Sequence, residues 1–240
     1  MGNPAIVLDK VGVAFNTGRR AGSRSSFWPF GRAEKYWALK DVSLQVESGE
    51  IVGVVGLNGS GKTTLLRTIA GIYLPDEGSI SVFEEVSTLL ALGVGFKTNL
   101  SGLENIYLTG ILMGYTKKQV QEYVDKIIEF AEIGDFIELP VRTYSTGMRA
   151  KLGFAISVYL NKGIMLIDEI LSVGDARFRS KSKQKLLEII QSRSSTVLIA
   201  SHNTGFLAEI SDSMIMLQSG RIIEAGEPEK VIEAYKAAAK

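Results

Sequence analysis

Short runs of apolar and β-branched residues recur along this 240-residue chain, with segments of helical apolar spacing between them. Several of these runs are unbroken, which is typical of strands buried on both faces of a parallel sheet. The clearest runs span residues 5–8, 38–46, 51–55, 164–167, 196–200 and 214–217. Helical spacing is clearest at residues 62–70, 117–132 and 148–160. Strands that alternate with helices in this way predict an α/β fold.

One long segment departs from this alternation. Residues 99–160 carry almost no strand signal and contain two N-terminal capping boxes, which begin at Ser101 and Thr116. We therefore predict one domain in which residues 1–98 and 161–240 form an α/β core and residues 99–160 form a helical subdomain. Further along, residues 215–226 predict a hairpin, and Pro228 is expected to start a last helix.

The composition excludes several functional classes. Lys and Arg number 27 against 26 Asp and Glu, and a formal net charge of +1 argues against a globally basic nucleic-acid-binding protein. The absence of cysteine excludes a disulfide framework, a cysteine nucleophile and thiolate metal ligands. His202 is the only histidine, which excludes a multi-histidine metal site in one chain. Because no apolar run approaches 18 residues and no signal peptide is visible, we expect a cytoplasmic protein without a membrane span.

A glycine-rich sequence, GLNGSGKTT, follows the predicted strand at 51–55 and opens a predicted helix. It matches the phosphate-binding pattern G-x-x-x-x-G-K-[ST], in which backbone N–H groups and the helix dipole bind an anion. Lys62 is expected to bridge the β- and γ-phosphates of a nucleotide, and the Thr63 hydroxyl to ligate Mg²⁺. The predicted nucleotide contacts are Gly56, Asn58, Gly59, Ser60, Gly61, Lys62, Thr63 and Thr64.

Polar residues also follow two other predicted strands. Asp168 and Glu169 end the run IMLIDE, where Asp168 is expected to hold Mg²⁺ through water and Glu169 to act as general base toward an attacking water. His202 directly follows the run TVLIAS. In isolation the acids are consistent with a strand that ends in a solvated loop, and the histidine with an ordinary surface or core residue. The shared position at the carboxyl ends of strands, together with the phosphate loop, favours a common catalytic site.

The sequence YSTGMRAKL begins a predicted helix with Ser145 as its N-cap. The simplest interpretation is a structural cap. The alternative is that the free N–H groups of the first turn form a second anion site, which binds a nucleotide held by another molecule.

The ordered set GLNGSGKTT, YSTGM, IMLIDE, SVGD and SHN resembles the nucleotide-binding subunit of an ATP-binding cassette (ABC) transporter over nearly the whole chain. The resemblance implies the ABC ATPase form of the P-loop NTPase fold, with a mixed sheet core, an antiparallel β subdomain and a helical subdomain. It also implies ATP hydrolysis with Mg²⁺, and a homodimer in which two subunits enclose two ATP molecules.

Further roles are implied by the same resemblance. Ser145, Thr146 and Gly147, called the signature segment below, would act in trans on the ATP of the partner subunit. Ser172 and Asp175 would belong to a loop that couples the two ATP sites, and His202 would contact the γ-phosphate.

Two departures from the family pattern stand out. The usual signature has Gly and Gln where this chain has Thr146 and Met148. In addition, no glutamine occurs between Gln45 and Gln119, so the glutamine that the family places in its Q-loop is missing.

The segment 92–108, with YSTGM and ILSVGDARF, is similar to a subgroup that exports lipid-linked polysaccharides such as O-antigen, capsule or teichoic acid. It implies a separate membrane-spanning permease as partner and a peripheral position at the cytoplasmic face of the membrane, with O-antigen as the first expectation. The length suggests the short form, without a carbohydrate-binding domain. Open alternatives are export of a drug, lipid or peptide, a soluble ABC-type ATPase that acts on nucleic acid or ribosomes, and a binding-only regulator.

Residues 16–37 form an insert between the first two predicted strands, with five basic residues, one acid and both tryptophans of the chain. One interpretation is a solvated loop folded on the core. The other is a segment that reaches the membrane face and the pyrophosphate-linked end of the glycan lipid. Either Phe15 or Trp37 is expected to stack on adenine, and the sequence leaves both open.

Overall fold

The computed structural model describes residues 3–20, 33–89, 95–168 and 174–238. The chain divides into two compact units of similar internal connectivity. Unit 1 consists of Met1–Ser48, Val52–Phe83 and Ala200–Lys240, and unit 2 of Gly49–Ile51 and Glu84–Ile199. The helices of residues 99–160 share unit 2 with three strands, so the predicted boundary around a separate helical subdomain stays a prediction.

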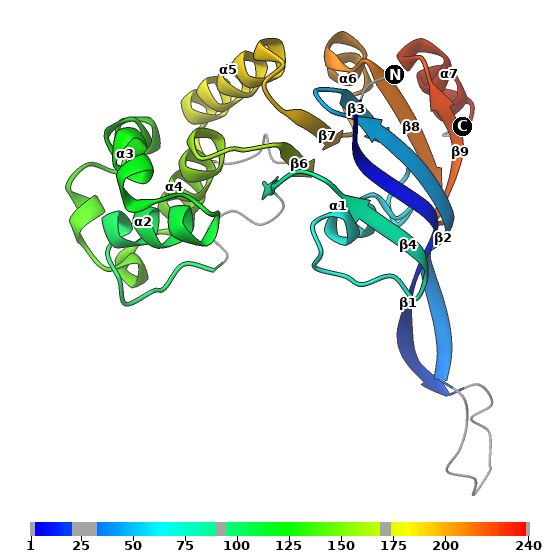
Figure 1. Ribbon diagram of the computed structural model, residues 1–240, viewed down its shortest axis with the longest axis horizontal. Helices are drawn as coiled ribbons and strands as arrows, with labels where there is room; N and C mark the ends of the chain where they lie inside the picture. The colour runs from blue at the N-terminus through cyan, green and yellow to red at the C-terminus, as the bar shows by residue number, and fades with distance from the viewer. Residues whose placement is uncertain (1–2, 21–32, 90–94, 169–173, 239–240) are drawn as a thin grey trace, which may run out of the picture. The chain divides into compact units, whose positions relative to one another are not determined.

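Unit 1 contains a three-stranded antiparallel sheet in the order β2-β1-β4, formed by β1 (Pro4–Arg20), β2 (Ala33–Glu47) and β4 (Glu77–Val82). Strands β1 and β2 pair from Pro4↔Glu47 to Arg20↔Ala33, and they run side by side as the long ribbon of Figure 1. The structure extends both strands into residues 16–20 and 33–37, the two ends of the segment that the sequence assigned to an insert, and that insert stays a prediction. Antiparallel backbone pairing continues there without the apolar alternation that marks a strand in sequence. The rest of the insert, residues 21–32, lies outside the described residues.

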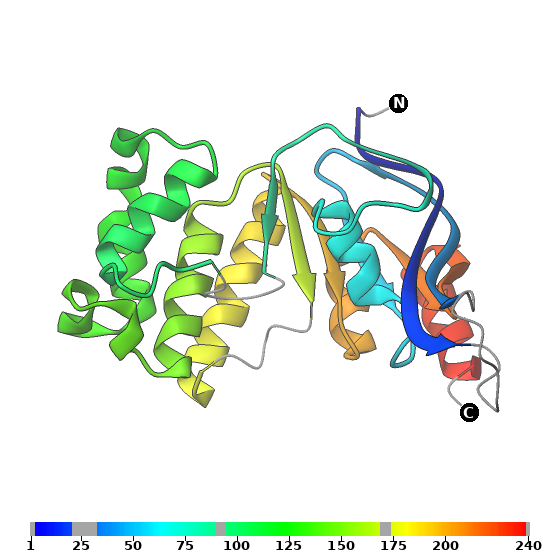
Figure 2. The same ribbon diagram turned by 90° about the horizontal axis from the view of Figure 1, so that it is seen from below.

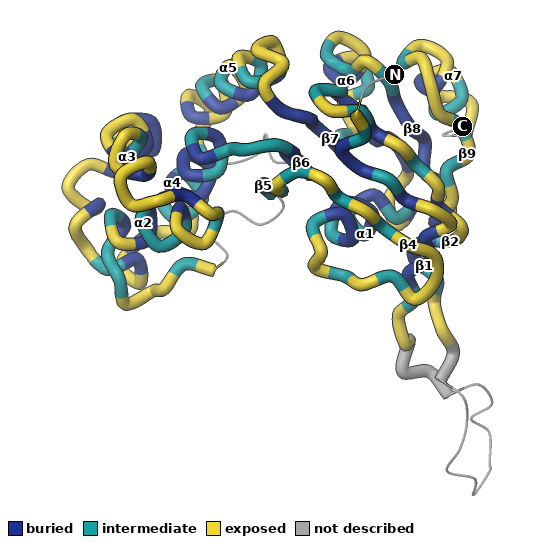
Figure 3. Tube along the Cα trace, in the orientation of Figure 1, coloured by how far each residue is buried: buried dark blue, intermediate teal, exposed yellow. Residues whose placement is uncertain are grey.

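A second group of strands in unit 1 leads to the candidate site. β3 (Ile51–Val55) pairs in parallel with β8 (Ser213–Gln218), and β8 pairs antiparallel with β9 (Arg221–Gly226). Every residue of β3 is buried, which explains its unbroken apolar run. Figure 3 shows the same burial in dark blue along most of its neighbour β8. The predicted hairpin turns at Ser219 and Gly220, whose φ angles of 49° and 79° suit a two-residue turn. The helices of unit 1 are α1 (Lys62–Ile69), α6 (Thr204–Ile210) and α7 (Pro228–Ala238).

Unit 2 joins three strands to four α-helices. The strand order is β5-β6-β7, with β5 (Val86–Thr88) parallel to β6 (Ile164–Asp168), followed by β7 (Thr196–Ala200). Figure 2 shows the helices beside one another in green to yellow. They are α2 (Gly102–Leu112), α3 (Lys117–Ala131), α4 (Thr146–Tyr159) and α5 (Ala176–Ser192), with 3₁₀ turns η1 (Gly134–Glu138) and η2 (Val141–Thr143). Both predicted capping boxes form.

An aromatic cluster holds the last three of these helices together. The rings of Phe130 on α3, Phe154 on α4 and Phe178 on α5 have centroids 5.6–6.0 Å apart. Sequence patterning missed α5 because Ser182 occupies a buried position between the apolar residues Phe178 and Leu186. Among the described residues, no helix combines the length and the apolarity needed to cross a membrane.

Candidate nucleotide-binding site

The glycine-rich loop lies between β3 and α1, where the sequence predicted it. Gly61 precedes α1 with a φ of 111°, and a Cβ at this position would lie 2.7 Å from the Ala38 carbonyl oxygen. Only glycine fits here, because other residues rarely adopt this φ and would collide with the backbone of β2. No side chain caps the first turn of α1. The first turn of α1 is thus not closed by a side chain, which is typical of helix N-termini that bind anions.

Lys62 lies within the loop instead of extending into solvent. Its ammonium donates hydrogen bonds to the Gly56 carbonyl oxygen at 2.7 Å and the Leu57 carbonyl oxygen at 3.2 Å, and the residue is 8% exposed. The side chain thus reaches from the end of the loop back to its first two residues. This arrangement holds a positive charge against the backbone carbonyl groups of the loop.

The loop is anchored on one side and open on the other. The Ser60 carbonyl oxygen accepts a hydrogen bond from Gly220 N–H at 2.9 Å, and the Gly220 carbonyl oxygen accepts one from Lys40 N–H at 2.8 Å. A Cβ added at Gly59 would meet no atom within 4 Å. Ser60 is 4% exposed, and its hydroxyl oxygen has no hydrogen-bond partner among the described residues. The anchored backbone is pre-formed, and the buried hydroxyl and the open side fit a phosphate group.

The donor set also fits Mg²⁺. Thr63 follows Lys62 in the first turn of α1 and supplies a hydroxyl, and Asp168 ends β6 with a carboxylate, which are oxygen ligands that Mg²⁺ prefers. These two residues belong to different units. Glu169, the predicted general base, and Ser172 lie outside the described residues.

His202 is exposed and lies in unit 1, two residues after β7. The N–H of the preceding Ser201 donates to the Val54 carbonyl oxygen at 3.4 Å, at the end of β3 that leads into the glycine-rich loop. The neighbouring Asn203 caps α6 by accepting from Phe206 N–H at 3.0 Å. The structure therefore brings the histidine's backbone to the same end of β3 as the loop, as the sequence predicted from strand ends.

The two candidate adenine-stacking residues differ in their surroundings. Phe15 on β1 is 37% exposed and meets the ring of Tyr73 edge-on at 5.2 Å. Trp37 on β2 is partly buried, and its ring atom Cζ3 lies 2.8 Å from the place that a Cβ would take on Gly12. The indole of Trp37 thus packs directly on β1, whereas the Phe15 ring keeps more of its surface available.

The signature segment begins α4 in unit 2. The Ser145 hydroxyl accepts a hydrogen bond from Met148 N–H at 3.1 Å and caps the helix, while Thr146 and Gly147 are exposed in the first turn. A cleft of about 460 Å³ opens beside them. Its lining is Glu132, Ser145, Gly147, Met148, Lys151, Gly174 and Asp175.

Ion pairs surround this cleft. Lys151 on α4 lies 2.9 Å from a carboxylate oxygen of Asp175, which also caps α5 by accepting from Phe178 N–H at 2.9 Å. The Phe178 N–H and the Lys151 ammonium together lower the pKa of Asp175 to about 2. Glu132 lies 2.7 Å from Lys181 on α5, whose hydrogen bond lowers the pKa of that carboxyl. Sequence reasoning missed Lys151 and Glu132, and it placed Asp175 in the coupling loop without its role as the cap of α5.

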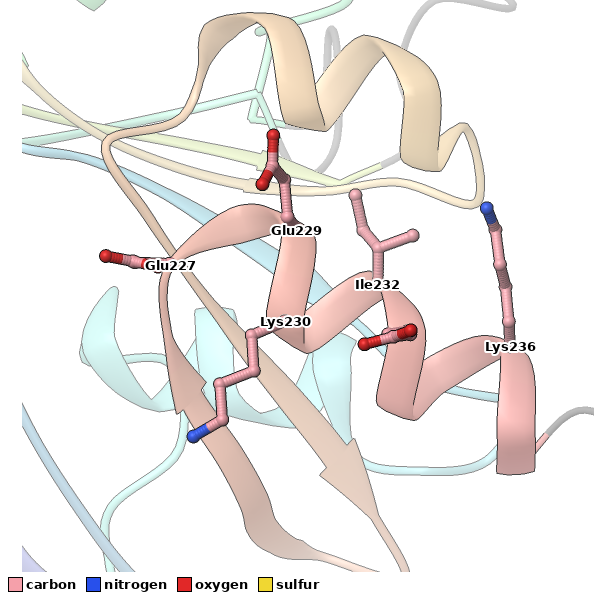
Figure 4. A pocket seen from close by; sticks show the side chains of 6 residues that line it. Glu227, Glu229, Lys230, Ile232 and Lys236 are labelled. Carbon is pink, nitrogen blue, oxygen red and sulfur yellow. The ribbon is translucent and has the colours of Figure 1, made fainter.

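A second hollow follows α7 in unit 1. Figure 4 shows that the side chains of Glu229, Ile232 and Lys236 point to one side of this helix and that of Lys230 to the other. Lys230 is paired with Glu224 at 3.0 Å. No group of three or more His, Asp or Glu suited to a metal ion occurs in the described ranges.

The sequence family described as ABC transporter matches residues 39–172, more than half of the chain. This chain belongs to the ABC transporter family. The match covers the glycine-rich loop, the signature segment and Asp168, and it confirms the predicted enzyme class, an ATPase of the ABC type. Proteins of this fold bind ATP with Mg²⁺.

Its relatives belong to polysaccharide export systems. The chain is 42% identical over 207 residues to the O-antigen export system ATP-binding protein RfbB of Klebsiella pneumoniae, covering 86% of this chain and 84% of that protein. It is 40% identical over 238 residues to the teichoic acids export ATP-binding protein TagH of Shouchella clausii, covering 98% of this chain and 66% of that protein. The chain thus spans slightly less than two thirds of that relative, and 43% of TagH from Lactococcus lactis. The resemblance to the polysaccharide-exporter subgroup is confirmed.

Solved structures agree on the fold. An ATP-binding subunit of an ABC transporter matches with a TM-score of 0.76 at 18% identity, over 97% of this chain and 93% of that one. A dimeric ATP-binding cassette in a post-hydrolysis state with ADP and phosphate matches with a TM-score of 0.73 at 20% identity, over 93% of this chain and 98% of that one. These likenesses confirm the predicted fold class, an ABC ATPase with a mixed sheet, an antiparallel β subdomain and helical parts.

Proposed function

We propose that this chain is the ATP-hydrolysing subunit of a transporter that exports a lipid-linked polysaccharide across the cytoplasmic membrane, with O-antigen as the first candidate. The observation that carries the proposal is the 42% identity to an O-antigen export protein over most of both chains. Teichoic acid is the second candidate, because several relatives are named for its export. Capsule polysaccharide belongs to the same chemical class.

Hydrolysis is assigned to residues around the glycine-rich loop. Lys62 would leave the Gly56 and Leu57 carbonyl oxygens to bind the β- and γ-phosphates, which offer it a stronger, charged acceptor. Thr63 and, through water, Asp168 would hold Mg²⁺, which supplies neutralisation of the developing phosphate charge when it is bound. Glu169 would accept the proton of the attacking water, and His202 would contact the γ-phosphate.

The signature segment would complete the partner's site in a homodimer. Its exposed first turn offers N–H groups at the positive end of α4, which suits a γ-phosphate held by the other subunit. Substitution of the usual Gly and Gln by Thr146 and Met148 leaves these backbone groups in place. Asp175 would place the coupling loop relative to α4 through its ion pair with Lys151.

Adenine recognition is assigned to Phe15. Its ring is more exposed than that of Trp37 and is supported edge-on by Tyr73, while Trp37 packs on Gly12. A supported aromatic face that remains accessible is what base stacking requires.

The partners follow from the same proposal. A membrane-spanning permease, two copies in the assembly, would hold this chain at the cytoplasmic face of the membrane, and the lipid-linked polysaccharide would be its substrate. A nucleic-acid partner is not expected at a formal net charge of +1.

Copurification tests the proposal. The chain, expressed with its neighbouring permease and purified in mild detergent, is expected to carry a lipid that mass spectrometry identifies as a glycan linked through pyrophosphate. A copurified permease that carries only ordinary phospholipid, with an ATPase rate unchanged by added glycan lipid, would contradict it.

A further inference from the structure

Asn105 is a polar residue with a fully buried side chain, in the first half of α2. Its side-chain oxygen accepts a hydrogen bond from Lys97 N–H at 2.8 Å. Its amide group donates to the carbonyl oxygens of Lys97 at 3.1 Å, Leu100 at 3.3 Å and Ser101 at 2.8 Å. Both polar atoms of this side chain are thus hydrogen-bonded to the backbone of one short segment. We call this segment, residues 97–101, the strap.

The strap is a tight turn with an exposed tip. Leu100 N–H donates to the Lys97 carbonyl oxygen at 3.0 Å and closes the turn, while Lys97, Thr98 and Asn99 are exposed. The strap lies in the stretch where the sequence lacks the family's glutamine. Asn105 supplies four side-chain hydrogen bonds to the strap, whereas the turn itself is closed by the single backbone bond between Leu100 and Lys97.

The strap is joined to the segment that leads into the signature. Val141 N–H donates to the Leu100 carbonyl oxygen at 2.9 Å, and Arg142 N–H donates to the Thr98 carbonyl oxygen at 2.8 Å. Pro140 pairs with the end of the strap in an isolated antiparallel bridge. Residues 140–142 are therefore hydrogen-bonded to the strap through their backbone, and Ser145 follows three residues later.

The residue between them is also fixed. Tyr144 is 3% exposed, and its hydroxyl donates to the Phe136 carbonyl oxygen at 2.6 Å. The same hydroxyl leaves no room for a side chain at Gly102, the first residue of α2. The residue directly before Ser145 is thus held by burial, by its hydrogen bond and by close packing on the start of α2.

We propose that Asn105 is a positioning residue for ATP hydrolysis, which holds the signature segment in place through the strap and residues 140–142. Force applied to the exposed tip at 97–99 reaches Ser145 by the same hydrogen bonds. This inference rests on the proposed role of the signature segment in hydrolysis. It gives the chain a coupling element at a place where the usual glutamine is missing.

The test compares three variants of the full chain in an ATPase assay at saturating and limiting ATP. Asn105→Ala removes the four hydrogen bonds to the strap. Val124→Ala is the stability control, because Val124 is buried in α3, in the same unit, without a hydrogen bond from its side chain to the strap. Ser145→Arg is the reference for loss of the signature segment itself. Melting temperatures are measured for all of them.

The glycine-rich loop lies in the other unit, so Asn105→Ala is expected to leave the KM for ATP unchanged and to lower kcat by about tenfold or more. Val124→Ala, with a similar fall in melting temperature, is expected to keep kcat within about twofold. Equal losses of kcat in both variants, or a change in KM that follows kcat, would overturn the proposal. If Ser145→Arg lowers kcat and Asn105→Ala does not, the positioning role of Asn105 is refuted, and the role of the signature segment in hydrolysis is retained. If Ser145→Arg has no effect on kcat, the role of the signature segment in hydrolysis is refuted, and the inference that rests on it is overturned as well.

A disulfide supplies a rescue in case Asn105→Ala loosens the unit. The chain contains no cysteine, so Thr98→Cys with Arg142→Cys introduces one defined pair across the strap. In the Asn105→Ala background, oxidation is expected to restore kcat and reduction to remove the gain. An oxidised protein that stays as slow as the reduced one would contradict the proposed path.

Discussion

The Lys151 ammonium lies 2.9 Å from a carboxylate oxygen of Asp175, and this pair joins the helix of the signature segment to the first turn of α5. Asp175 has a second task, because its other oxygen caps α5. One carboxylate thus sets both the start of α5 and its tie to α4. The loop that the sequence assigned to coupling between ATP sites ends on this residue.

Two replacements of Asp175 separate its ion pair with Lys151 from its role as the cap of α5. Asp175→Asn retains a good N-cap and removes the charge, so stability is expected to fall less than in Asp175→Ala, which removes both. Because folding lowers the pKa of Asp175 from 3.8 to about 2, its contribution is fully present above about pH 4 and is lost as the pH falls toward 2. Thermal melts of wild type and Asp175→Asn should therefore converge between these pH values. A gap that stays constant down to pH 2 would contradict the ion pair.

Lys62 is the residue whose loss should affect nucleotide affinity most directly. Lys62→Ala removes the only side-chain ammonium that the structure places inside the glycine-rich loop among the described residues. We expect ATP hydrolysis to fall by at least about a hundredfold, with weakened ATP binding by calorimetry. Lys40→Ala is the control, since Lys40 contributes its backbone N–H to the anchor and keeps it in the variant. Normal turnover by Lys62→Ala would place the phosphates elsewhere.

The assignment of Glu169 as general base predicts a separation of binding from turnover. Glu169→Gln keeps the size and polarity of the side chain and removes its basicity, so ATP should still bind while hydrolysis becomes very slow. Retained ATP on the purified variant, measured by chromatography of the released nucleotide, checks the expectation. Turnover at the wild-type rate would assign the base to another residue.

Variants of Phe15 and Trp37 are expected to differ in their KM for ATP, because we assign adenine stacking to Phe15. Loss of stacking in Phe15→Ala is expected to raise the KM for ATP by about tenfold with little change in kcat. Trp37→Phe retains an aromatic ring against Gly12 and should leave KM near the wild-type value. The reverse pattern would assign adenine stacking to Trp37.

Much of the fold was predictable because its strands are buried on both faces and its helix ends carry explicit caps. The bounds of β3 and α7 agree with the apolar run at 51–55 and with the proline that starts the last helix. The long continuation of β1 and β2 was not predictable, since backbone pairing there needs no apolar pattern. The helix α5 was not predicted, because the buried Ser182 interrupts its apolar face.

The candidate site also contains residues that were predictable from the sequence and residues that were not. The glycine-rich loop, the cap at Ser145 and the strand-end position of His202 were readable from residue types and order. Lys151 and Asn105 were not, because a lysine or asparagine on a helix has no distinctive pattern in one sequence. Their importance comes from partners distant along the chain, at Asp175 and at the backbone of residues 97–101.

The most direct test of the central claim is transport itself, measured with the chain and its permease in proteoliposomes loaded with lipid-linked polysaccharide. We predict that ATP drives the glycan to the opposite leaflet, that glycan lipid raises the ATPase rate, and that both effects are lost in Lys62→Ala. Glycan movement that is equal with and without ATP, or an ATPase rate indifferent to both permease and glycan lipid, would contradict the account.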